Sequence, residues 1–141
     1  MKENEREALR WYRQAADDLR FAEWVLHEGR FFDKGCFISQ QAGEKALKSC
    51  LYAAGSRRVF GHSLVDSCTE LLPKSPAFAK AEEPSKRLDR FYIPTRYPNG
   101  LPGGLPFQSY SKKDLQEAID DLTVIFEVCS DYLTRRGIDI S

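Results

Sequence analysis

Cysteine is scarce in this sequence, and no pair of cysteines forms a recognisable motif. The four cysteines, Cys36, Cys50, Cys68 and Cys129, lie far apart, with neither a CxxC pair nor a nearby histidine. Zinc sites and disulfide frameworks of small secreted proteins use close, regular spacings. We therefore expect reduced thiols that are mostly buried, and we predict neither a metal site nor a cofactor.

Long hydrophobic runs and an excess of charge are also absent. No stretch of 18 apolar residues occurs, and the first twenty residues carry charges throughout. These features argue against a membrane span and a secretory signal, so we expect a cytoplasmic protein that does not contact the membrane. Lys and Arg total 21 and Asp and Glu total 21, which leaves no net charge. This balance disfavours a general nucleic-acid coat protein, which is usually basic, but it allows a local basic site.

What the sequence does contain is enough apolar residues for one core. The chain has 141 residues, of which 42% are hydrophobic and 30% are charged. Domains cluster near 100 to 150 residues, and a chain of this length builds a core without metals or disulfides. We therefore predict a single domain over residues 1–141.

Helical periodicity runs through most of the chain, and no segment alternates as a strand does. Apolar residues recur at three- and four-residue steps from about Glu3 to His27, and again in a last helix that begins after Ser111. A second helix is predicted from a cap at Asp33 to about Ala54, and shorter helices over 63–72 and 76–92. Residues 93–108 hold four prolines and three glycines, so we expect a long loop there without regular helix. The fold class is all-α, with three long helices, shorter ones, and a Pro/Gly-rich loop before the last helix.

The second helix carries a mixed stripe of polar and aromatic side chains. Phe37, Gln41, Glu44, Lys48 and Tyr52 follow one another at three- and four-residue steps. Such a stripe suits a surface that meets another helix, a second subunit or a ligand. The alternative is an exposed Glu44–Lys48 ion pair between two partly covered rings.

A short basic turn follows this helix and leads to one of only two histidines. Arg57 and Arg58 precede His62. An imidazole can transfer protons at neutral pH, and an arginine can hold a phosphate through two hydrogen bonds. These are two of the groups that cleave RNA without a metal. The alternative is that His62 caps the next helix and that the arginines are solvated.

The loop before the last helix contributes a second cluster, Arg96 and Tyr97, with Tyr92 upstream. Arginine beside stackable rings can bind a nucleotide, and it is equally common in protein interfaces. Glycine-rich phosphate loops and the HExxH motif are absent, which removes support for standard nucleotide hydrolases and zinc proteases. We expect the stripe of the second helix and the Arg96–Tyr97 cluster to converge on one recognition surface.

Four segments together resemble the HEPN domain family. They are AADDL at 15–19, QQAGEKALK at 40–48, GHSL at 61–64 and TRYP at 95–98. The resemblance covers about residues 8–133. It implies an antiparallel, up-and-down helical bundle that commonly forms a homodimer.

The resemblance also carries expectations about function. Small family members are often paired with a minimal nucleotidyltransferase, in a toxin–antitoxin-like arrangement. This implies a nucleotide- or RNA-binding protein whose matching positions are Gln41, Glu44, Lys45, Lys48, Arg96 and Tyr97. Many family members are metal-independent ribonucleases with an Arg-x4-6-His motif, which here corresponds to Arg57 and His62. A pure protein-interaction scaffold is the remaining alternative.

Overall fold

A computed structural model describes residues 1–141, and all its regular elements are helical. The three long helices are α1 (Glu3–Glu28), α2 (Phe32–Ala53) and α6 (Lys112–Arg135). Between α2 and α6 lie α3 (Leu64–Leu71), the 3-10 turn η1 (Pro76–Ala81), α4 (Glu82–Asp89), the 3-10 turn η2 (Pro98–Gly100) and α5 (Pro106–Ser109). The predicted all-helical class with three long helices is confirmed.

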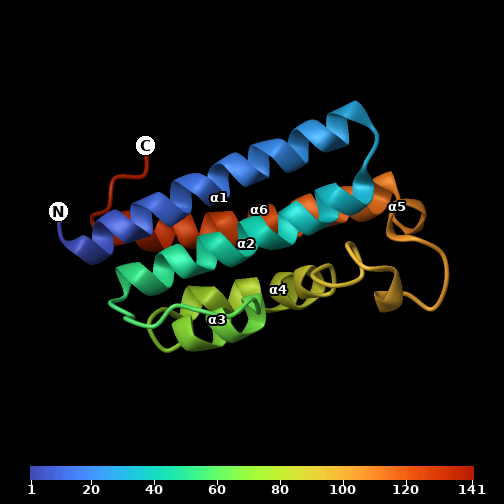
Figure 1. Ribbon diagram of the computed structural model, residues 1–141. Helices are drawn as coiled ribbons and strands as arrows, with labels where there is room; N and C mark the ends of the chain where they lie inside the picture. The colour runs from blue at the N-terminus through green and yellow to red at the C-terminus, as the bar shows by residue number, and fades with distance from the viewer.

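A sharp turn joins α1 to α2 and sends the chain back along α1 (Figure 1). Gly29 ends α1 with φ at 75°, a left-handed conformation in which glycine has no Cβ to clash. Phe31 then adopts the same conformation, with φ at 63°, immediately before α2. The predicted cap at Asp33 is wrong, because this left-handed turn starts the helix earlier and leaves Asp33 inside its first turn.

The second long helix is the centre of the bundle. It packs against α1 on one side, against α6 on another, and against α3 and α4 below (Figure 1). Close approach of α3 and α6 to α2 needs a small residue at Gly43, where a Cβ would meet Leu64 at 2.5 Å. Leu47, Leu64, Leu88 and Leu122 are completely buried in the core that these helices share. None of the helices has the length and apolar character that crossing a membrane requires.

The short helices are held by side-chain caps. Ser63 caps α3 as predicted, because its Oγ accepts a hydrogen bond from the backbone N–H of Asp66 at 3.1 Å. Asp89, at the end of α4, adds a second set of bonds by accepting from the backbone N–H groups of Leu64 and Val65 at 2.8 and 3.1 Å. These contacts tie the start of α3 to the end of α4, next to His62.

The Pro/Gly segment is not free of helix. Pro98 and Pro106 each open a short helical element, η2 and α5, because proline already has the φ angle of a first helical residue. The expectation of a loop without regular helix over 93–108 is therefore wrong at η2 and at α5. Figure 1 shows α5 and the preceding loop at the end of the bundle where α2 begins.

Candidate functional site

The polar face of α2 is buried. Glu44 and Lys48 are 5% and 6% exposed, and Lys48 Nζ donates to Glu44 Oε1 at 2.8 Å. The alternative of an exposed Glu44–Lys48 pair is therefore wrong. Gln41 Nε2 also donates to Glu44, at 2.9 Å, and to the side-chain oxygen of Gln40 at 2.8 Å. A buried carboxylate requires such partners, because an unpaired charge in the interior is strongly unfavourable.

His62 lies against this cluster and faces the surface. Its Nδ1 is 3.0 Å from Glu44 Oε1, and Gln40 Nε2 donates to the His62 backbone carbonyl at 2.9 Å. With Nδ1 donating to the carboxylate, the neutral ring carries its lone pair on Nε2, which makes no hydrogen bond within the protein. The His62 side chain is 62% exposed. The arrangement orients an imidazole whose second nitrogen can accept a proton from a molecule at the surface.

Arg96 sits in a box of aromatic rings. Its Cζ lies 4.5 Å from the ring centroids of Phe37 and Tyr92 and 5.0 Å from that of Tyr97. Arg96 Nε donates to the Tyr92 carbonyl at 2.8 Å. The terminal guanidinium nitrogens bond to no protein group. The rings therefore hold a cation whose outer edge can pair with an anion.

Tyr92 joins the two clusters. The His62 ring stacks on it with centroids 4.9 Å apart and an interplanar angle of 21°, and Arg96 covers the same residue. Phe37 adds a second link, because this residue of α2 contacts both Tyr92 and Arg96. The α2 stripe and the Arg96–Tyr97 cluster meet at Phe37, whereas Glu44 and Lys48 of the stripe are buried. That these residues form one recognition surface stays a prediction.

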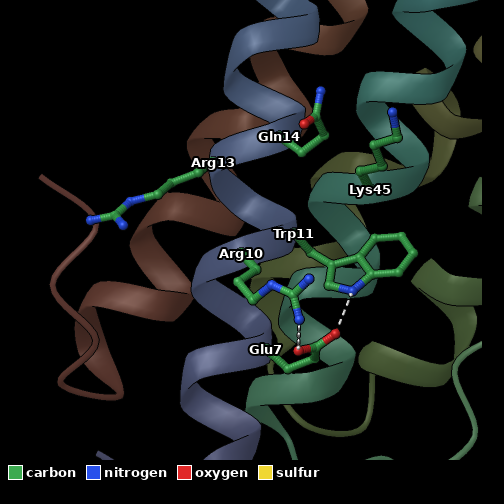
Figure 2. A pocket seen from close by; sticks show the side chains of 6 residues that line it. All are labelled: Glu7, Arg10, Trp11, Arg13, Gln14 and Lys45. Carbon is green, nitrogen blue, oxygen red and sulfur yellow. Dashed lines mark hydrogen bonds and ion pairs between the residues drawn. The ribbon is translucent and has the colours of Figure 1, made fainter.

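The same α2 face continues to a groove beside α1. Trp11 contacts Tyr52 with ring centroids 5.7 Å apart and an interplanar angle of 36°, and Lys48 Nζ lies 5.4 Å from the Trp11 centroid. A cavity of about 610 Å³ is lined there by Glu7, Arg10, Trp11, Arg13, Gln14 and Lys45. Figure 2 shows Glu7 accepting from both Arg10 and Trp11, at 3.0 and 3.2 Å, while Arg13 points away from the others.

Lys45 faces this groove and not Glu44. Its Nζ donates to Asp18 of α1 at 2.6 Å, and Gln14 donates to the other oxygen of the same carboxylate at 3.2 Å. Trp11 falls in the three- and four-residue apolar repeat of the first helix, yet it is only half-buried. The polar indole N–H of Trp11 and the charged residues beside it in the sequence were the features that could have indicated a position in a surface groove.

The basic turn before His62 is exposed. Arg57 and Arg58 form no hydrogen bond or ion pair with His62, whose partners are Glu44 and Tyr92. Arg87, a cation of α4 upstream of Tyr92 in the chain, forms two hydrogen bonds with Asp121 of α6 at 2.9 and 2.8 Å. Among the basic residues from Arg87 to Arg96, only Arg96 stacks on the ring that His62 contacts.

All four cysteines are buried as unpaired thiols, as expected for reduced structural cysteines. Burial raises the pKa of Cys36 to about 12 and that of Cys68 to about 11. A raised pKa keeps the thiol protonated, which makes it a weak nucleophile. No cluster of three His, Cys, Asp or Glu side chains in the structure has an arrangement that would hold a metal ion.

A family model and a known protein each match most of this chain. The family model described as HEPN domain matches residues 8–132. The chain is 29% identical over 139 residues to "Putative toxin MJ1304" of Methanocaldococcus jannaschii, covering 88% of this chain and 86% of that protein.

Solved structures are similar along nearly their whole length. TT1696 from Thermus thermophilus is 34% identical with a TM-score of 0.81, covering 89% of this chain and 98% of that one. ST0689, an archaeal HEPN homologue, is 31% identical with a TM-score of 0.73, covering 94% and 99%. A HEPN domain protein from Thermotoga maritima is 29% identical with a TM-score of 0.67, covering 89% and 98%.

Proposed function

The chain belongs to the HEPN domain family, and from this premise we propose that it is a toxin-like protein that binds single-stranded RNA or nucleotides through the surface around Arg96. Similarity to a protein named as a toxin supports the toxin-like role. The surface consists of Phe37, His62, Tyr92, Arg96 and Tyr97.

The observation that carries this proposal is the stacking of Arg96 among three rings beside His62. Single-stranded nucleic acids bind where aromatic rings stack on bases and cations pair with phosphates. Tyr97 is 48% exposed and offers such a ring. The terminal nitrogens of Arg96 offer two donors to a phosphate, and a guanidinium pairs with it in a forked geometry.

The remaining positions of the α2 stripe serve this surface in different ways. Gln41 and Glu44 hold His62 in place through the bonds described above. Lys48 is buried beneath this face, where it pairs with Glu44 and lies 5.4 Å from the Trp11 ring centroid. Lys45 lines the Trp11 groove, where further bases and phosphates can lie. The RNA path therefore runs from Arg96 past His62 toward Trp11.

Partners follow from the family. A minimal nucleotidyltransferase as antitoxin and a second copy of this chain are the partners we assign. On α1, Phe21 and Trp24 are 46% and 54% exposed and stack on each other, with centroids 6.0 Å apart. Exposed paired rings of this kind are typical of a protein interface.

Fluorescence anisotropy with a labelled RNA of about 12 nucleotides, a length within the range of known single-strand sites, tests the binding proposal. A 2′-O-methyl RNA prevents cleavage during the measurement. We expect Arg96→Ala to weaken binding by roughly tenfold or more, the scale of one lost base stack and phosphate contact. Arg87→Ala is the matched control, because Arg87 pairs with Asp121 away from the rings. Equal affinity of wild type and Arg96→Ala, or no binding by wild type, would refute the proposal.

A second candidate function is metal-independent cleavage of RNA, and the Glu44–His62 contact favours it. A carboxylate on Nδ1 leaves Nε2 to take the proton of a ribose 2′-hydroxyl, while a cation stabilises the charged phosphate. Arg57 is the cation that the family motif assigns, and Arg96 is the one that shares Tyr92 with His62.

Incubation of unmodified RNA with the protein in excess EDTA distinguishes this candidate from simple binding. His62→Ala should abolish cleavage, and comparison of Arg57→Ala with Arg96→Ala identifies the cation. Cleavage that persists in His62→Ala would exclude His62 as the proton acceptor.

A further inference from the structure

A second cavity, of about 390 Å³, lies at the start of α2. Its lining comes from the first turns of α2, from the Thr95–Pro98 segment, and from Leu105–Phe107 at the start of α5. Figure 1 shows α5 against this end of the bundle. Of its residues, Phe37 and Arg96 were candidates from the sequence. A cavity of this size falls within the usual range for small-molecule sites.

Asp33 is the unusual member of this lining. The residue is 3% exposed, and its Oδ2 accepts from Lys34 Nζ at 2.9 Å. Its Oδ1 is buried and has no hydrogen-bond partner. An acidic residue in a first helical turn is stabilising at the surface, but that role does not require burial. Buried polar atoms in native proteins almost always have a partner. Asp33 lines the cavity and its Oδ1 has none, so a donor supplied from outside the chain would complete it.

Asp33 and a second carboxylate, Asp114, act on the same neighbouring groups, and two cations lie on the other side of Asp33. Burial raises the pKa of Tyr110, and the nearby groups that raise it further include Cys36, Asp114 and Asp33. Toward the opening, Lys34 and Arg96 line the same cavity. A ligand that fits this field carries an N–H donor at one end and an anion at the other.

Aromatic and flat groups complete the cavity. Phe37 lines it beside Arg96, and Phe107, 63% exposed, stands on the opposite segment. Aromatic rings of this kind stack on a planar nucleobase whatever its identity. A nucleotide of cytosine, adenine or guanine combines all three properties, because its base is planar, its exocyclic amino group is a donor, and its phosphate is an anion.

We propose that this cavity binds a nucleobase that carries an exocyclic amino group, with that N–H donating to Asp33 Oδ1 and the phosphate directed to Lys34 and Arg96. The inference rests on the proposed RNA binding and adds a base preference to it. Uracil is disfavoured, because it presents carbonyl O4 where cytosine presents the N4 amino group, and a carbonyl facing a carboxylate is repelled.

Cytosine and uracil provide the sharpest comparison, since they have the same ring size and differ in this group. The experiment measures anisotropy of labelled 2′-O-methyl C-only and U-only oligonucleotides of about 12 residues. We expect wild type to bind the C-only strand roughly tenfold more tightly, the scale of a hydrogen bond to a charged group. Asp33→Asn should bring the two affinities to within about twofold, because an amide can also donate to O4.

Asp66→Asn is the matched control, because Asp66 also lies in a first helical turn but is exposed. This control should keep the cytosine preference, and thermal unfolding checks that Asp33→Asn is folded. Equal binding of C-only and U-only strands by wild type would overturn the base preference, and so would a preference that survives in folded Asp33→Asn. In both cases the proposed function stands, provided that binding still depends on Arg96. If wild type binds neither strand, both the base preference and the proposed RNA binding are refuted.

Discussion

Helices α2 and α6 lie against each other, yet they place their polar residues differently. On α6 the apolar residues face inward, and ion pairs such as Lys113–Glu117 and Arg135–Asp131 lie on the surface. On α2 the side chains of Asp33, Glu44 and Lys48 are buried instead. Burying charged groups is unfavourable even when they are paired. Folding alone accounts for the polar residues of α6, whereas the buried charges of α2 lie in the candidate site.

The largest expected effect comes from removing Glu44. Glu44→Ala leaves Lys48 buried without its carboxylate, and breaking a buried pair in this way costs about 3–5 kcal/mol of unfolding free energy. Asp131→Ala on α6 removes a surface pair and should change stability by about 0.5 kcal/mol or less. Urea unfolding followed by circular dichroism measures both. Equal losses for the two variants would break the contrast between the helices.

The next effect comes from buried thiols, of which Cys36 lies on α2 and Cys68 lies on α3. Burial raises the pKa of Cys36 from the ordinary 9.0 to about 12 and that of Cys68 to about 11. Above pH 9 the unfolded chain releases these protons while the folded chain keeps them. Stability should therefore fall as pH rises, by about 1.4 kcal/mol per pH unit for each such thiol.

Cys36→Ala isolates the contribution of α2 to this alkaline loss. Between pH 9 and about 12, the unfolding free energy of this variant should fall less steeply with pH than that of wild type. The difference in slope should be about 1.4 kcal/mol per pH unit, the contribution of one thiol. The measurement is urea unfolding at several alkaline pH values. An unchanged slope would show that the Cys36 thiol ionises in the folded state as readily as in the unfolded chain.

The smallest effect concerns how the helices begin. Ser111 caps α6 by accepting from the Asp114 N–H at 3.3 Å, and Asp114 returns a bond to the Ser111 N–H at 2.8 Å. Ser111→Ala should lower the unfolding free energy by about 1 kcal/mol. Thr134→Ala, at an exposed position of α6, should stay within about 0.5 kcal/mol. If Ser111→Ala does not lower the unfolding free energy, the cap does not stabilise α6. The first turn of α6 would then resemble that of α2, which has no side-chain cap.

The predictable part of the fold was the local part. Gly29, Ser63 and Ser111 mark helix ends by backbone conformation or by a hydrogen bond three residues away, so they are readable from neighbouring residues. Phe31 escaped this reading because a phenylalanine in the left-handed region is uncommon. The resulting shift of the helix start is the reason that the role of Asp33 was misjudged.

The candidate site was predictable in its members but not in its pairings. The sequence pointed to Glu44, His62 and Arg96, and placed Tyr92 with Arg96, but it paired His62 with Arg57. The structure pairs His62 with Glu44 and Tyr92. Residues so far apart in the chain meet only when three segments pack together, and no local pattern records that distance.

Periodicity, capping residues and the Pro/Gly segment were sufficient to establish an all-helical chain with three long helices, because helix formation depends on residues a few positions apart. Packing then decided which polar groups share a neighbourhood. The ring box around Arg96, the carboxylate behind His62 and the lone oxygen of Asp33 exist because α2 is enclosed on several sides. Burial and partnership are properties of the assembled bundle, since they depend on which segments meet in space.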